Sequence, residues 1–223
     1  MFATPVFHLG PIVMTTTVVT TWGIMLLLTG LAWWVSHRVR LEPSPLQVVC
    51  EGIVGAIDQA IRDVVPEHSQ RVLPFIATLW IFLVIANLSG IVPEMHAPTR
   101  DLSATSALAV LVFLSVHWFG ITTAGLRHYL RHYLAPTPIL LPFHLISNIT
   151  RILALAIRLF GNMMSLELAA LLVLLVAGFL APVPLLMLHI IEALVQAYIF
   201  GMLALIYVAG AMQAQQLRQS KEE

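Results

Sequence analysis

Ionisable side chains that are unusual for a membrane span stand in stretches of this 223-residue sequence that are otherwise almost entirely apolar. They are Arg158 and Glu167 in one stretch, and His189 and Glu192 in the next. A charged side chain at the centre of a bilayer costs about 2.5–3.5 kcal/mol on insertion scales, so such residues usually serve a function. Because carboxylates and imidazole can pass a proton or attract a cation, we predict a proton relay or cation path. The alternative is a set of hydrogen-bonded clamps that only hold helices together.

The spacing around Arg158 indicates which polar groups share a helix face. Asn162 follows Arg158 by four residues and Arg151 precedes it by seven, so a helix places all three on one face. Glu167 follows Arg158 by nine residues, half a turn out of phase, which excludes a simple salt bridge within the helix. Arg151 lies nearer the helix end, where its side chain can reach the interface as an anchor. Arg158 lies too deep for that.

A second polar stripe is expected on the last apolar helix. His189, Glu192 and Gln196 stand at positions i, i+3 and i+7 and therefore fall on one face. We expect Glu167 to meet His189 or Glu192 across the short turn between the two helices. Gln196 is expected to pair with the face that carries Arg158.

Further polar residues gather near the end of the second apolar stretch. They can attract cations at an entrance or simply face water in a loop, and the sequence favours neither reading. The set comprises Asn87, Ser89, Glu94, His96 and Asp101.

The composition excludes several classes of protein. Only 10% of the residues are charged and 59% are hydrophobic, whereas soluble domains carry about 25% charge, so a soluble globular enzyme is excluded. Equal numbers of basic and acidic residues, 11 each, exclude a nucleic-acid-binding footprint. The single cysteine, Cys50, cannot form an internal disulfide. The sequence lacks a Gly-rich phosphate loop of the Walker A type, so ATP chemistry is not expected in this chain, and no cofactor or metal site is predicted.

Five apolar stretches are long enough to cross a bilayer, which takes about 20 residues. They cover residues 12–36, 72–92, 102–126, 143–181 and 185–217. The last two would form helices of about 55 and 50 Å, longer than the hydrocarbon core, so we expect them to be strongly tilted. Residues 43–65 carry apolar side chains at helical spacing among charged ones, which predicts an amphipathic interfacial helix on the membrane surface or against a partner helix. The expected fold is a single all-α membrane domain over residues 1–223.

Basic residues outside the spans concentrate on one side of such a five-span arrangement. By the positive-inside rule this side is cytoplasmic, so the N-terminus is predicted outside and the C-terminus in the cytoplasm. The residues on this side are Arg38, Arg40, Arg62, Arg71, Arg127, Arg131, Arg218 and Lys221, whereas Arg100 falls on the other.

A family resemblance rests on the segment 157–163, which reads Ile-Arg-Leu-Phe-Gly-Asn-Met. Together with Glu167, His189 and the Gln-Ala-Tyr-Ile-Phe segment at 196–200, it resembles subunit a of the membrane sector of F-type ATP synthases. The Asn-Leu-Ser-Gly-Ile-Val-Pro segment at 87–93 is also similar to that family. The Arg-Leu-Phe-Gly-Asn core, with a Glu nine residues after the Arg and a His and Gln seven residues apart downstream, is highly specific. The likeness covers essentially the whole chain.

The resemblance implies a role for each polar residue. Arg158 matches the family's essential arginine, which faces the carboxylate of the rotating c-ring. Glu167 and His189 match a polar pair in the aqueous half-channel on the outer side, and Gln196 matches a residue packed near the arginine. Asn162 matches the asparagine of the motif.

Two assignments extend this set. The resemblance implies that Asn87 lines the entrance channel, and Glu192 belongs to the same polar stripe as the matched histidine. The implied partners are the c-ring, the peripheral-stalk b subunits, the lipid bilayer and, indirectly, the catalytic head that carries out ATP catalysis. Segments 98–103 and 141–147 look closest to an alternative bacterial branch associated with sodium-type rings.

The implied function is translocation of protons or sodium ions through two half-channels beside the ring. A short N-terminus without a transit peptide favours a bacterial inner membrane over an organelle. The alternative is a stand-alone secondary transporter or channel, but such proteins often show paired inverted halves, and the sequence has no matching halves.

Overall fold

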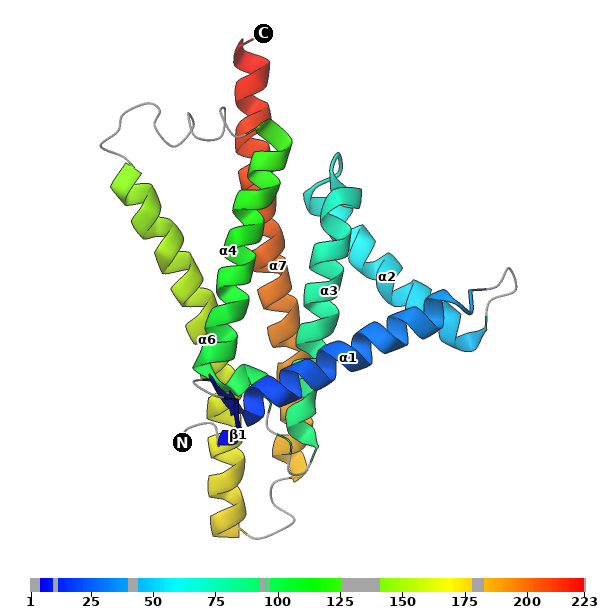
Figure 1. Cartoon of the computed structure of the whole chain (residues 1–223), viewed down its shortest axis with the longest axis vertical. Coiled ribbons are helices and arrows are strands. Elements are labelled where there is room, and N and C mark those ends of the chain that lie inside the picture. The colour runs from blue at the N-terminus through cyan, green and yellow to red at the C-terminus, as the bar shows by residue number, and fades with distance from the viewer. Residues whose placement is uncertain are drawn as a thin grey trace.

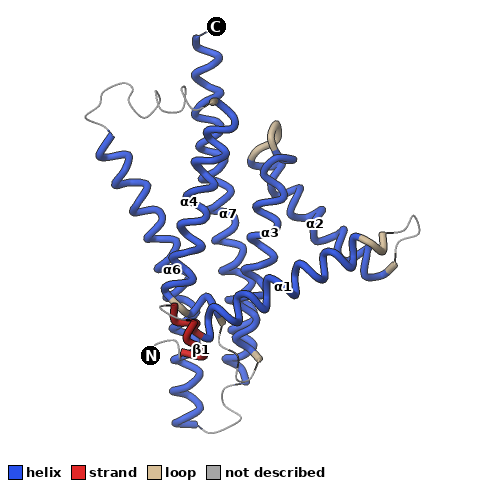
Figure 2. Tube along the Cα trace, viewed as in Figure 1, coloured by secondary structure: helices blue, strands red, loops and turns tan. Residues whose placement is uncertain are grey.

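The computed structural model describes residues 5–9, 12–39, 44–92, 95, 97–125, 141–177 and 183–222. Apart from a short N-terminal hairpin, this part of the chain is almost entirely helical (Figure 2). The elements are β1 (Pro5–Leu9), β2 (Ile12–Thr15), α1 (Thr16–Ser36), α2 (Pro45–Val64), α3 (Ser69–Leu88), η1 (Ser89–Ile91), η2 (Pro98–Arg100), α4 (Leu102–Ala124), α6 (Leu141–Ala177) and α7 (Val183–Glu222).

Five helices are long and apolar enough to cross a membrane: α1, α3 with η1, α4, α6 and α7. The predicted all-α membrane fold is therefore confirmed, and the chain is a multi-pass membrane protein. With 37 and 40 residues, α6 and α7 are longer than a bilayer core requires. In Figure 1, α6 runs obliquely to α4 and α7.

The first span begins later than predicted. Residues 12–15, expected to open it, form strand β2, which pairs antiparallel with β1. Ile12 and Val13 are β-branched and favour a strand, and the neighbouring segment supplies a pairing partner for the backbone. The helix itself starts at Thr16.

Local sequence signals define several helix ends. The Ser44 side chain caps α2 by accepting a hydrogen bond from the Gln47 N–H at 3.3 Å, and Pro45 occupies the first turn, where its missing N–H costs nothing. Gly125 ends α4 with a φ of 81°, a conformation that side chains with a Cβ rarely adopt.

Helix α7 lies at the centre of the bundle. It packs against α3 and α4 and contacts α6, while α4 also packs along α6. In Figure 1, α1 and α2 extend away from this group, and α1 contacts α3 and η2 but leaves most of its apolar side chains exposed. Such a surface suits lipid contact.

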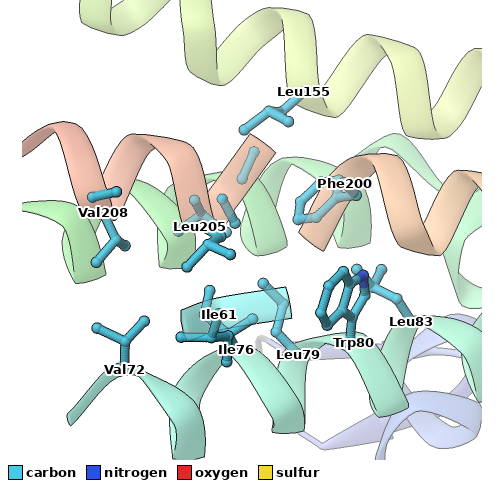
Figure 3. Close-up of a cluster of buried hydrophobic side chains, with 14 of the residues drawn as sticks. Ile61, Val72, Ile76, Leu79, Trp80, Leu83, Leu155, Phe200, Leu205 and Val208 are labelled. Carbon is cyan, nitrogen blue, oxygen red and sulfur yellow. The ribbon is translucent and has the colours of Figure 1, made fainter. Parts of the chain in front are cut away.

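The principal core forms where α2, α3 and α7 meet, with additions from α4 and α6 (Figure 3). Amphipathic α2 contributes Ile61, which is fully buried, whereas Leu46, Val49 and Ile53 in its first half are exposed. The apolar side chains of α2 therefore pack against the bundle mainly in its second half, although Gln47 in the first turn is also buried. The larger buried side chains of the core are Ile61, Val72, Ile76, Leu79, Trp80, Leu83, Leu155, Phe200, Leu205 and Val208.

Asp101 joins the start of α1 to the start of α4. Its carboxylate accepts hydrogen bonds from the Thr17 hydroxyl at 2.9 Å and from the Ser103 N–H at 3.0 Å, so it caps α4 and fixes α1 at once. Burial raises the pKa of Asp101, but these hydrogen bonds and the nearby Arg100 charge outweigh burial and lower the pKa below its ordinary value.

We expect Asp101→Ala to lower the free energy of unfolding by about 0.5–2 kcal/mol, because α4 loses its cap and α1 loses its link to α4. Unfolding in detergent micelles measures the change. Ser106→Ala is the matched control, since the Ser106 hydroxyl donates to the Ser103 carbonyl of its own helix.

The lowered pKa adds a pH test. A depressed carboxylate pKa contributes stability above the ordinary pKa, and this contribution disappears as the pH falls through the lowered value. The stability gap between wild type and Asp101→Ala should therefore narrow in acid. A gap that stays constant down to low pH would contradict this role.

Candidate functional site

A short hydrogen bond between two side chains joins α6 to α7 in the interior of the helix bundle. Asn162 donates from Nδ2 to Gln196 Oε1 at 2.6 Å, and the Gln196 side chain is only 2% exposed. Gln196 thus meets the face that carries Arg158, as the sequence predicted, although the partner is Asn162 and not the arginine itself. This hydrogen bond satisfies the carbonyl oxygen of the Gln196 amide but not its NH2 group.

A second contact fixes the register of the same two helices. The Arg151 guanidinium lies over the Tyr207 ring, 5.3 Å from its centroid. Arg151 lies as far before Asn162 as Tyr207 lies after Gln196, so both contacts belong to one antiparallel register. A cation over an aromatic face is favourable by about 0.5–2 kcal/mol, so this pair adds a second connection toward the C-terminal end of α7.

Arg158 lies between these two contacts along α6. The register places it level with Phe200, which is buried, while Arg158 itself is exposed. Ile157 and Leu153 beside it are also exposed. Within the described residues Arg158 has neither a hydrogen bond nor an ion pair. An arginine on an exposed apolar helix surface within a membrane span needs an acidic or polar partner.

On its other side, α7 is bonded to α3. Asn87 donates from Nδ2 to the Ala193 carbonyl at 3.1 Å, and His189 Nε2 lies 3.4 Å from the Asn87 carbonyl oxygen. Asn87 is fully buried and His189 is 9% exposed. Among the described residues, Asn87 Oδ1 and Gln196 Nε2 are buried without a partner. The Asn87 oxygen can accept from a water or bind a cation, and the Gln196 NH2 group can donate to a water.

His189 opens onto a small cavity between η1 with the segment after it, α6 and α7. The cavity has a volume of about 60 Å³ available to water, and one water needs roughly 10–15 Å³. At Gly90 an added Cβ would lie 3.1 Å from the Ala97 Cβ, which is tight, and 3.5 Å from His189 Nε2, which is ordinary contact. The lining residues are Gly90, Met95, Ala97, Met163, Leu166, Ala170, Leu185, Leu186 and His189.

Of the two membrane carboxylates, Glu167 and Glu192, the structure describes the side chain of Glu192 only. Glu192 is half-buried and close enough to His189 for their charges to interact. Glu167 belongs to α6, and the register puts its backbone level with Ile191, but its side chain lies outside the described residues. Its expected contact with His189 or Glu192 therefore stays a prediction.

The remaining polar set does not form one cluster. Ser89 donates to the Ala86 carbonyl at 2.7 Å within its own turn, and Asp101 caps α4. Glu94 and His96 lie outside the described residues. No group of three or more metal-binding side chains occurs in the described ranges.

The sequence pattern did not indicate two features of this region. Trp80 on α3 donates from Nε1 to the Tyr198 carbonyl at 3.3 Å, and Gly90 faces His189. Each depends on contacts between helices distant in sequence, and neither residue belongs to a polar stripe. A tryptophan within an apolar stretch reads as ordinary core.

Comparison with known proteins adds independent findings. The sequence model of the family described as ATP synthase A chain matches residues 18–209. "ATP synthase subunit a 2" of Pelobacter propionicus is 66% identical over 97% of this chain and 95% of its own length. "ATP synthase subunit a 1" of Hahella chejuensis is 62% identical, covering 95% and 90%. "ATP synthase subunit a" of Legionella pneumophila is 55% identical, covering 97% and 94%.

We expect the Asn162–Gln196 pair to show a coupling energy of about 0.6–1.7 kcal/mol in a double-mutant cycle of Asn162→Ala and Gln196→Leu. Removing either partner exposes the other to an apolar environment, so the two losses are not additive. SDS-induced unfolding in mixed micelles measures each variant.

A cycle of Asn162→Ala with Ser115→Ala serves as the control, because Ser115 donates to the Val112 carbonyl within α4. That cycle should be additive. Additive losses for Asn162 and Gln196 would show that the short contact does not link the helices.

Proposed function

The chain belongs to the ATP synthase A chain family, and from this membership we propose that it moves cations through two half-channels beside the rotating c-ring of an F-type ATP synthase. The family places the chain in the membrane sector of the complex. Subunits of this family are not catalytic by themselves, since ATP synthesis and hydrolysis occur in other subunits. The cation is a proton or a sodium ion.

The observation that carries this proposal is Arg158, which is exposed and has no hydrogen bond or ion pair among the residues that the structure describes. A ring carboxylate can face lipid only in its neutral form, because a bare anion in hydrocarbon is very costly. Beside Arg158 the anion is stabilised, since a nearby positive charge lowers the pKa of a carboxyl group. Each ring site would therefore release its cation to one half-channel, pass Arg158 as an anion and reload from the other.

The same charge would also prevent a leak. A cation that tried to cross directly between the half-channels would meet the guanidinium and be repelled. Arginine remains protonated at any working pH and is better suited to this role than lysine. Each unit charge moved through 100 mV supplies about 2.3 kcal/mol, so several steps are combined to form one ATP.

Residues near His189 would form the outer half-channel. The small cavity, the free Asn87 Oδ1 and the neighbouring Glu192 supply polar groups and room for water along one path. Glu167, level with this region, would complete the path from α6. Asn162 and Gln196 would hold together the two helices that face the ring. The Gln196 NH2 group, which has no partner among the described residues, would supply a hydrogen-bond donor near the level of Arg158.

The surroundings follow from this role. The c-ring would contact the Arg158 surface, b subunits would bind elsewhere on the chain, and the catalytic head would act only indirectly. We propose a bacterial inner membrane with the N-terminus outside and the C-terminus in the cytoplasm, as the distribution of arginines predicts. A stand-alone transporter is the rival function, and transport by the purified chain alone in liposomes would favour it.

Arg158→Ala should abolish ATP-driven cation pumping while the complex still assembles, because the ring anion loses its counter-charge. Pumping is measured in membrane vesicles, and assembly by immunoblotting of the purified complex. Arg62→Ala is the matched control: Arg62 forms an exposed ion pair with Asp58 at 2.8 Å, and its loss should leave pumping intact. Normal pumping by Arg158→Ala would refute the proposed gate.

Glu167→Gln and His189→Ala should each slow pumping without eliminating it, because water in the cavity can still carry cations past the missing group. Initial pumping rates per assembled complex provide the measurement. If both variants pump at the wild-type rate, neither residue belongs to the path.

A further inference from the structure

Trp80 reaches from α3 to the backbone of α7 (Figure 3). Its indole N–H donates to the Tyr198 carbonyl at 3.3 Å, and its ring stacks on the Tyr198 ring with centroids 5.7 Å apart and planes inclined by 14°. The side chain is 7% exposed. In a membrane an indole N–H needs an acceptor, and here it uses a helix carbonyl that already belongs to the ladder of α7.

Gly201 makes this approach possible. A Cβ built at Gly201 would overlap the indole atoms of Trp80, so any larger residue would force the ring or the helix to move. Gly210 on the same helix has nothing within 4 Å of such a Cβ. The absence of a side chain at 201 is therefore specific to the place where Trp80 sits.

A second side chain from α3 holds α7 in the same way. Asn87 lies seven residues after Trp80, on the same helix face, and donates to the Ala193 carbonyl. The two acceptor residues, Ala193 and Tyr198, lie on either side of Gln196 along α7. The stretch of α7 that carries Gln196 is thus fixed from the α3 side at two points.

On the opposite side, that stretch makes its contact with α6. Gln196 accepts from Asn162 at 2.6 Å, a distance that leaves little slack for a shift or rotation of α7. The antiparallel register puts Trp80, Tyr198 and Gly201 close to the level of Arg158. A displaced indole would therefore rotate α7 at the height where the ring is expected to pass.

We propose that Trp80, seated on Gly201, is a positioning residue for cation translocation, because it sets the rotation of α7 that brings Gln196 to Asn162 beside Arg158. This inference rests on the proposed function. Trp80 touches neither the ring nor the cation and acts through α7. Its loss alters the geometry of the gate more than the folding of the chain.

The experiment compares Trp80→Phe, Gly201→Ala and the double variant in the intact ATP synthase complex in membrane vesicles. ATP-driven pumping is measured per assembled complex across a range of pH. Trp118→Phe controls for loss of a tryptophan, since Trp118 is 68% exposed on α4. Gly210→Ala controls for an added methyl on α7.

Gly201→Ala should lower pumping per complex by up to about 100-fold, since misplacement of a functional group by about 1 Å can cost that much. Trp80→Phe should reduce it less, because it removes the N–H and shrinks the ring. The double variant should pump faster than Gly201→Ala, since the smaller ring makes room for the methyl group. In Trp80→Phe the pH profile should shift, and both controls should match wild type.

Three results would overturn the inference: wild-type rates and pH profile in both single variants, losses that only parallel the amount of assembled complex, or a double variant no better than Gly201→Ala. If Gly201→Ala fails to assemble, Trp80→Phe and its pH profile decide. Arg158→Ala is measured alongside. If Arg158→Ala does not pump while Trp80→Phe pumps at the wild-type rate and with the wild-type pH profile, only the positioning role is rejected. If Arg158→Ala pumps at the wild-type rate, the proposed function is rejected.

Discussion

The structure depends on one unsatisfied interaction, that of the Arg158 guanidinium on the exposed apolar surface of α6. A charge in such a place is costly, and none of the described residues of the chain compensates it. The cost is tolerable only if a partner supplies an anion or water at that level. Membership of the ATP synthase A chain family identifies a membrane-sector subunit, for which we propose a position beside the c-ring. The proposed gate follows from combining these two facts.

The remaining polar contacts give this charge a defined position. In a membrane, helices do not associate through the hydrophobic effect, so packing and hydrogen bonds between them fix their geometry. Helix α7 is the central element because it bonds to α6 through Asn162 and Gln196 and to α3 through Asn87. Trp80 adds a close approach that requires a glycine opposite it. A rigid pair of helices can then present the guanidinium at a constant height to a moving partner.

Much of this arrangement could be predicted from the sequence, because membrane spans and costly polar residues are local signals. The apolar stretches predicted five helices, and the spacing of Gln196 predicted a contact with the Arg158 face. The short hairpin was missed, since residues 12–15 continue the apolar run and only the pairing with β1 makes them a strand. The Trp80–Gly201 contact could not be predicted, because it arises between helices whose relative rotation no periodicity defines. For the same reason the sequence could not tell which residue of the Arg158 face would be the partner of Gln196, which in the structure is Asn162.

The most direct test of the account is a cryo-EM structure of the assembled membrane sector at a resolution that shows side chains. If Arg158 is the electrostatic gate, its guanidinium faces the c-ring and lies within about 4–6 Å of a ring carboxylate, the range in which opposite charges shift each other's protonation. A guanidinium that reaches bulk solvent, or turns away from every ring helix, would contradict it.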